Sequence, residues 1–195
     1  MWCLRRALDA WNRGLGLRRG VAGPPRAGSL IVGLGNRGAR YRRTRHNAGA
    51  LFLDFLAAQP GGPAAALATG GAPVDLLLPS TYMNVSGRPV VRKLRELGLA
   101  PTQLVLVQDD LDLPLGRVRI KHQGAARGHR GVASVVASLR TDEIARIRIG
   151  IGRPEHRHQV SDYCLADFSA DEMDTLHRDA FPLALQRLRE VLGTS

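Results

Sequence analysis

The sequence is poor in cysteine and has no long apolar run. Its 195 residues include two cysteines, Cys3 and Cys164, so we expect neither a disulfide framework nor a cysteine-based zinc site. No apolar stretch approaches the roughly 18 residues that a membrane-spanning helix needs, so we expect a soluble protein that does not enter a membrane. The length predicts one domain with a sizeable core.

Acidic residues are scarce relative to basic ones. The chain has 17 Asp and Glu against 28 Lys and Arg, a formal net charge of +11. Six arginines and Asp9 give residues 1–28 a charge of +5, which leaves +6 on the remaining chain. The excess favours a polyanionic partner such as nucleic acid, and the tail alone does not account for it.

Residues 1–28 are rich in arginine and nearly free of acids. Their large apolar residues recur at roughly helical spacing: Trp2, Leu4, Leu8 and Trp11. This composition is typical of a transit peptide, so we expect a leader at 1–28, a domain at 29–195 and the mitochondrial matrix as location. The alternative locations are the cytoplasm and another organelle, and a basic arm that contacts RNA is a second interpretation of the leader.

Apolar patterning in the body predicts strands interleaved with helices. Short apolar or alternating runs predict strands near 30–34, 74–78, 103–112, 116–121 and 145–152, of which the continuous apolar runs at 30–34 and 74–78 predict buried strands. Helical spacing predicts helices near 47–58, 90–97, 131–139 and 169–192. Residues 59–73 are low in complexity and predict a connection. The pattern favours a single-domain α/β fold, a mixed twisted sheet flanked by helices on both sides.

Gly33, Gly35 and Gly38 have the spacing of a dinucleotide-binding turn. Such a site needs a helix that opens within the glycine cluster. Here the helical pattern starts only after Asn47. We therefore interpret the glycines as a tight turn that leaves a strand, presents Asn36 and leads the chain back to His46.

Five sequence blocks occur in an order that is specific as a set. They are GLGNRGARYRRTRHNAG (33–49), YMNVSG (82–87), QDDLDLPLG (108–116), GHRG (128–131) and RIRIGIGRP (146–154). Together they resemble the bacterial-type peptidyl-tRNA hydrolase family, in an organellar or eukaryotic member. The resemblance implies hydrolysis of the ester between a peptide and the 3′ ribose of tRNA, with no metal or cofactor. It also implies peptidyl-tRNA as partner, a monomer, and a possible association with the ribosome.

Ester hydrolysis needs an activated water, and the sequence offers a base for it. An imidazole titrates near physiological pH, so His46 is the candidate base. Asp109 ends a predicted buried strand, where its carboxylate can fix the imidazole tautomer and stabilise the imidazolium. By resemblance, His46 and Asp109 form the catalytic pair.

Further residues are assigned to the substrate. The residues expected to hold peptide or ribose are Asn36, Tyr41, Tyr82, Met83, Asn84 and Arg130. The residues expected to contact tRNA phosphates, around a glycine-rich turn, are Arg117, Arg119, Lys121 and Arg127. Capping is the alternative for Asn84, and core packing for Met83. His156 and His158 flank Arg157 without a third ligand nearby, so we interpret them as exposed loop residues.

Three departures from the family pattern support a second hypothesis. Arg130 stands where the family usually has asparagine, and Gln108-Asp109-Asp110 where it usually has His-Asp-Glu. The segment between His46 and Met83 is also short. The alternative is a hydrolase-like RNA-binding protein with weak or no activity. Retention of all four polar candidates favours the enzyme: Asn36, His46, Asn84 and Asp109.

Overall fold

The computed structural model describes residues 28–69 and 72–194, and its centre is a five-stranded sheet. The predicted leader lies outside these residues apart from Gly28. All five predicted strands form: β1 (Ser29–Gly33), β2 (Val74–Leu77), β3 (Leu104–Asp110), β4 (Val118–Lys121) and β5 (Ala145–Gly150).

The sheet is mixed, as predicted. Its strand order is β2-β1-β3-β5-β4, and every pair is parallel except β4 with β5. The prediction of a buried strand at 74–78 is wrong in one respect. β2 pairs with β1 alone, all its residues are half-buried, and the next residue, Leu78, is 49% exposed. An edge strand is open on one side, so its apolar run is not enclosed.

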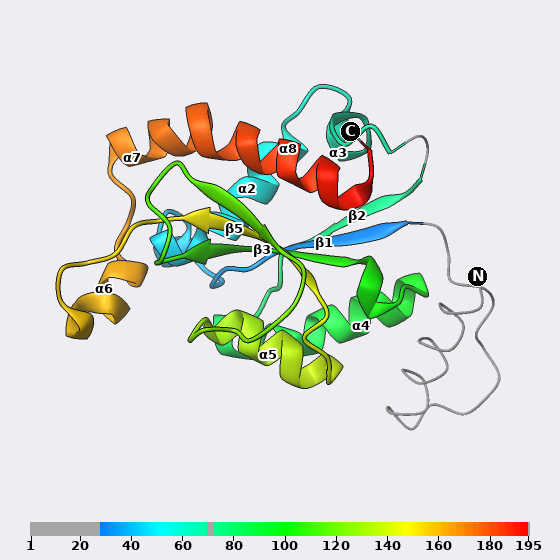
Figure 1. The fold of residues 1–195 in the computed structure, drawn as a ribbon, viewed down its shortest axis with the longest axis horizontal. Helices are drawn as coiled ribbons and strands as arrows, with labels where there is room; N and C mark the ends of the chain where they lie inside the picture. The colour runs from blue at the N-terminus through cyan, green and yellow to red at the C-terminus, as the bar shows by residue number, and fades with distance from the viewer. Residues whose placement is uncertain (1–27, 70–71, 195) are drawn as a thin grey trace.

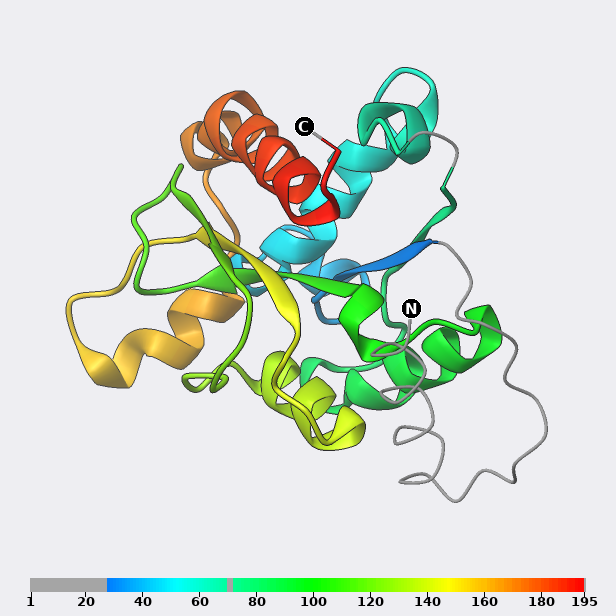
Figure 2. The same ribbon diagram turned by 45° about the vertical axis from the view of Figure 1, so that its right-hand side comes forward.

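Helices cover both faces of the sheet (Figures 1 and 2). One face carries α2 (Ala48–Ala57) and α8 (Phe181–Leu192), and the other carries α4 (Gly87–Leu97) and α5 (Arg130–Leu139). The α7 helix (Ala170–Thr175) continues through a π-helical turn, Leu176–Ala180, into α8. No helix in the described ranges is long and apolar enough to cross a membrane.

Two short helices were not predicted. The low-complexity connection contains α3 (Gly62–Ala66), and α6 (Val160–Leu165) follows β5. Pro63 falls in the first turn of α3, where its missing N–H costs nothing, and the left-handed Gly61 precedes the helix. Neither helix carries enough apolar periodicity to stand out in the sequence.

The glycine-rich turn after β1 leads into 3₁₀ turns rather than a helix, which agrees with our interpretation against a dinucleotide site. The α2 helix begins at Ala48, directly after a 3₁₀ turn at Arg45–Asn47. Gly49 lets this helix approach the sheet closely, because a Cβ there would lie 2.2 Å from the carbonyl oxygen of Val107. The close approach brings His46, just before α2, against the end of β3.

Candidate active site

A cleft of about 620 Å³ opens at the carboxyl end of the parallel strands. Among its lining residues are all eight that the sequence assigned to catalysis and substrate binding: Asn36, Tyr41, His46, Tyr82, Met83, Asn84, Asp109 and Arg130. They come from segments far apart in the chain that the fold brings together. Met83 is also 4% exposed and packs in the core, so it belongs to both environments.

His46 and Asp109 form a hydrogen-bonded pair within this cleft. The Nδ1 atom of His46 lies 2.8 Å from Oδ1 of Asp109. The carboxylate side chain is 3% exposed and the imidazole 15% exposed. Because an ionised carboxylate only accepts, Nδ1 carries the proton and donates it, which leaves the Nε2 lone pair of His46 free. This geometry suits a general base.

A second histidine, which the sequence did not single out, bonds to the same carboxylate oxygen. Nε2 of His129 lies 3.0 Å from Oδ1 of Asp109. His129 is also the N-cap of α5, where its Nδ1 accepts a hydrogen bond from the N–H of Val132 at 3.3 Å. Nδ1 is therefore the acceptor and Nε2 the donor of the ring. The GHRG block (128–131), which contains His129, is the sequence signal that points to this residue.

The pKa values of Asp109 and His46 are both shifted in this cluster. Burial opposes ionisation of Asp109, yet the two histidines that face it hold the pKa of its carboxyl far below the usual range. For His46, burial lowers the pKa, but the charge of Asp109 and its hydrogen bond outweigh burial and raise the pKa above 6.5; nearby Arg130 acts in the lowering direction. The base form of His46 therefore prevails only above that raised pKa.

By residue type, His46, Asp109 and His129 could also hold a metal ion, since their ligand atoms lie within 4.8 Å of one another. The hydrogen bonding of His129 disfavours that use. A metal on Nε2 would force the proton onto Nδ1, where it would face the N–H of Val132 instead of accepting from it. The arrangement fits a proton-holding cluster better than a metal site.

Hydrogen bonds to its neighbours fix Asn36 and leave its Nδ2 group available to the cleft. The side chain of Asn47 clamps its backbone, accepting from Asn36 N–H at 2.8 Å and donating to its carbonyl oxygen at 3.0 Å. Oδ1 of Asn36 accepts from Met83 N–H at 2.9 Å, which leaves its Nδ2 donor for another partner. Asn84 is exposed beside it, with no side-chain hydrogen bond to the described part of the chain.

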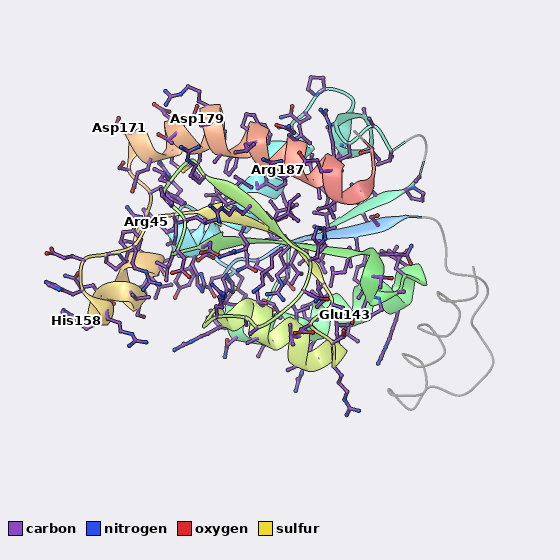
Figure 3. All side chains as sticks on the ribbon, in the orientation of Figure 1. Arg45, Glu143, His158, Asp171, Asp179 and Arg187 are labelled. Carbon is purple, nitrogen blue, oxygen red and sulfur yellow. The ribbon has the colours of Figure 1, made fainter. Side chains whose placement is uncertain are left out.

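Arg45 anchors the segment that carries His46. Its Nη2 atom meets both carboxylate oxygens of Glu172, at 2.8 and 2.7 Å, and Nη1 donates to the carbonyl oxygen of Asp167 at 2.9 Å. The guanidinium lies over the ring of Tyr163, 4.4 Å from its centroid. Figure 3 shows Arg45 beside the connection between α6 and α7. The chain after β5 thus holds the catalytic segment in place.

Comparison with known proteins agrees with this geometry. Residues 30–194 match the family model described as peptidyl-tRNA hydrolase. The chain belongs to the peptidyl-tRNA hydrolase family. The peptidyl-tRNA hydrolase of Symbiobacterium thermophilum is 47% identical over 154 residues, which cover 73% of this chain and 82% of that protein. The enzyme of Nocardia farcinica is 43% identical, covering 78% of this chain and 84% of its own length.

The fold is that of solved peptidyl-tRNA hydrolases. The crystal structure of the Acinetobacter baumannii enzyme superimposes with a TM-score of 0.75 at 34% identity, covering 88% of this chain and 92% of that one. The family resemblance expected from the five sequence blocks and the α/β fold are therefore both confirmed.

The basic residues assigned to tRNA divide into two groups. Arg127 lines the cleft together with Arg130. The lining does not include Arg117, Arg119 or Lys121. Arg119 and Lys121 lie on β4, paired across the sheet with Arg148 and Arg146 respectively, and all three named residues are at least partly exposed. They form a basic flank outside the cleft, and Lys121 also donates through Nζ to the carbonyl oxygen of Ala125 at 3.4 Å, within the glycine-rich turn before α5.

Gln108 and Asp110, the neighbours of Asp109 in the sequence, have different surroundings. Asp110 also lines the cleft and forms an ion pair with Arg148 at 2.5 Å. Gln108 is 5% exposed and donates through Nε2 to the carbonyl oxygen of Asp109, while its Oε1 has no partner among the described residues. His156 and His158 are exposed, as predicted, and their rings stack with centroids 5.5 Å apart, but His158 lies in a 3₁₀ helix, Arg157–Gln159, rather than in a loop.

Proposed function

We propose that the protein hydrolyses the ester between peptide and tRNA in peptidyl-tRNA, releasing the peptide and recycling the tRNA. The observation that carries the proposal is the His46–Asp109 pair in an open cleft, with Nε2 of His46 free. The relatives that match most of this chain are named peptidyl-tRNA hydrolases, and this supports the same reaction.

The reaction needs one proton to move twice. Nε2 of His46 accepts a proton from water as the water oxygen attacks the ester carbonyl carbon. The charge of Asp109 stabilises the imidazolium that forms. When the tetrahedral intermediate collapses, the bond to the ribose 3′ oxygen breaks and the imidazolium returns its proton to that oxygen. No redox step is involved.

Amide donors suit the developing oxyanion and the ribose. Nδ2 of Asn36 and the side chain of Asn84 have no hydrogen-bond partner among the described residues and line the cleft, which supports their assignment as donors to the substrate. Tyr41, Tyr82 and Met83 offer apolar and aromatic surface to the peptide or the terminal nucleotide. We assign Arg127 at the cleft and the basic flank of Arg117, Arg119 and Lys121 to RNA phosphates. We assign Arg130 to substrate binding within the cleft.

The test is hydrolysis of an N-blocked aminoacyl-tRNA by the full chain, with His46→Ala beside it. We expect turnover that the variant loses while its circular dichroism and unfolding midpoint stay those of the wild type. Equal turnover by His46→Ala would remove His46 as the base. Tight tRNA binding by the wild type without turnover would favour the RNA-binding alternative, for which Arg130 in the cleft is the motivating observation.

We also propose that residues 1–28 direct the protein to the mitochondrial matrix and that the protein acts as a monomer. The arginine-rich, acid-poor composition of the leader supports the first proposal. A fluorescent fusion of residues 1–28 tests it, with the arginines replaced by glutamine as control. Retention of the fusion in the cytosol would contradict it, and a dimer mass in sedimentation would contradict the second proposal.

A further inference from the structure

The loop between β1 and His46 carries a concentrated positive charge that nothing in the described chain neutralises. This arginine loop, residues 37–43, contains Arg37, Arg40, Arg42 and Arg43 and no acid. All four arginines are exposed, and none forms an ion pair with a described residue. By contrast, Arg178 and Arg187, near and on α8, form ion pairs with Asp179 and Glu190. A cluster of unpaired cations is costly unless an anion meets it.

Hydrogen bonds fix the backbone at the end of the arginine loop, and this fixes the positions from which the arginine side chains extend. Thr44 is buried, donates through Oγ1 to the carbonyl oxygen of Tyr41 at 2.9 Å and pairs with Asp167 in an isolated β-bridge. The carbonyl oxygen of Arg43 accepts from Phe168 N–H at 2.9 Å. The backbone is therefore tied to the segment after α6, while the arginine side chains point to solvent.

The loop also borders the reacting centre. Asn36 and Tyr41, before and within it, line the cleft. The guanidinium of Arg37 lies 5.2 Å from the ring centroid of Tyr82, which is 51% exposed at the cleft. Arginines interleaved with exposed aromatic rings suit a nucleic-acid strand, whose phosphates pair with the cations and whose bases stack on the rings. An acidic peptide would use the cations but not the stacking surface.

The arginine loop and the start of α5 each lie close in sequence to a histidine that contacts Asp109. The loop leads into His46, whereas Arg127 and Arg130 flank His129, and both histidines meet Oδ1 of Asp109. We propose that the arginine loop binds the sugar-phosphate backbone near the 3′ end of the tRNA, so that cations on two separate elements hold the RNA beside the ester. This inference rests on the proposed function and adds a second RNA-binding surface to it.

The decisive variant is Arg42→Gln/Arg43→Gln. Neither side chain makes a hydrogen bond or ion pair in the described structure, so the double change should not disturb folding. The matched control is Arg178→Gln/Arg187→Gln, which removes the same charge from the layer of α8, where Figure 3 labels Arg187. Neither pair belongs to the catalytic or substrate-binding residues described above.

We expect the loop variant to change both the salt dependence of tRNA binding and the KM for the substrate. The slope of log Kd for deacylated tRNA against log salt should fall by about 1.4 in the loop variant, since each phosphate contact to a single strand contributes about 0.7. The KM for N-blocked aminoacyl-tRNA should rise about 2- to 30-fold with kcat unchanged, the range for two exposed charge contacts. The control variant should leave the slope within error of the wild type.

A minimal substrate, N-acetyl-aminoacyl-adenosine, has the ester but no phosphate. The loop variant should hydrolyse it at the wild-type rate. A slower rate would place the loop at the peptide or the reacting centre and overturn the inference, as would an unchanged salt slope with tRNA. If the wild type binds tRNA but hydrolyses neither substrate, the proposed function fails, whereas the salt slope still decides whether the loop binds RNA.

Discussion

Replacing Asp109 by asparagine separates the charge of this residue from its geometry. Both histidines donate to the same oxygen, Oδ1, and Oδ2 takes part in neither bond. An asparagine can place its amide oxygen at the Oδ1 position and its NH₂ at the Oδ2 position. Both N–H donors then keep an acceptor and both tautomers are retained, so the variant loses the negative charge alone.

The size of the effect follows from that single loss. A unit charge about 4 Å from the imidazolium contributes roughly 4 kcal/mol at an effective dielectric of about 20, of which the amide dipole restores a part. A loss of about 2–4 kcal/mol corresponds to about a 30- to 1,000-fold fall in kcat. Asp109→Ala also leaves two buried N–H groups without an acceptor, so we expect a further fall and a loss of stability of about 1–3 kcal/mol per donor.

The assay is the pH profile of kcat/KM on N-blocked aminoacyl-tRNA. In the wild type, Asp109 raises the pKa of His46 above 6.5, so activity is lost as pH falls through that raised value. Without the charge, the acid limb of Asp109→Asn should move to lower pH while the plateau falls. An Asp109→Asn variant as inactive as Asp109→Ala, or one with an unmoved acid limb, would refute the reasoning.

Three more substitutions test the surroundings. Arg130→Asn removes a cation that lowers the pKa of His46, so the acid limb should move to higher pH, with faster turnover on the plateau and weaker tRNA retention at high salt in a filter-binding assay. Glu172→Gln should lower the free energy of unfolding in urea by about 1 kcal/mol. Burial raises the pKa of Glu172, but Arg45 and the hydrogen bonds of Ser169 outweigh burial and hold the pKa below its usual 4.5. The stability difference should therefore be full above about pH 4.5 and be lost as pH falls through the lowered pKa. Gly49→Ala should cost about 1–3 kcal/mol or more, because the added methyl meets the backbone of β3; an unfolding midpoint like that of the wild type would contradict the close packing.

The sequence predicted the parts that depend on local pattern. Apolar runs located the strands, including β3, and the sequence blocks placed His46 and Asp109 in one site. It did not reveal His129 as the second donor to Asp109, because this residue acts at once as helix cap and as neighbour of a residue 20 positions away. A sequence pattern shows neither role, since both depend on how α5 meets the end of β3.

The sequence also could not predict the ion pair between Arg45 and Glu172. Its carboxylate partner, Glu172, lies 127 residues further along, and no spacing rule connects the two. The clamp of Asn47 on the backbone of Asn36 spans only 11 residues, but it depends on the shape of the turn between them. In each case the motif identified the reacting groups, whereas tertiary contacts decide how rigidly they are held.

The tie between Arg45 and Glu172 also bears on when the protein becomes active. Here the segment with the catalytic histidine is synthesised early, but its anchor follows 127 residues later. The catalytic segment can therefore gain this anchor only after most of the domain has been synthesised.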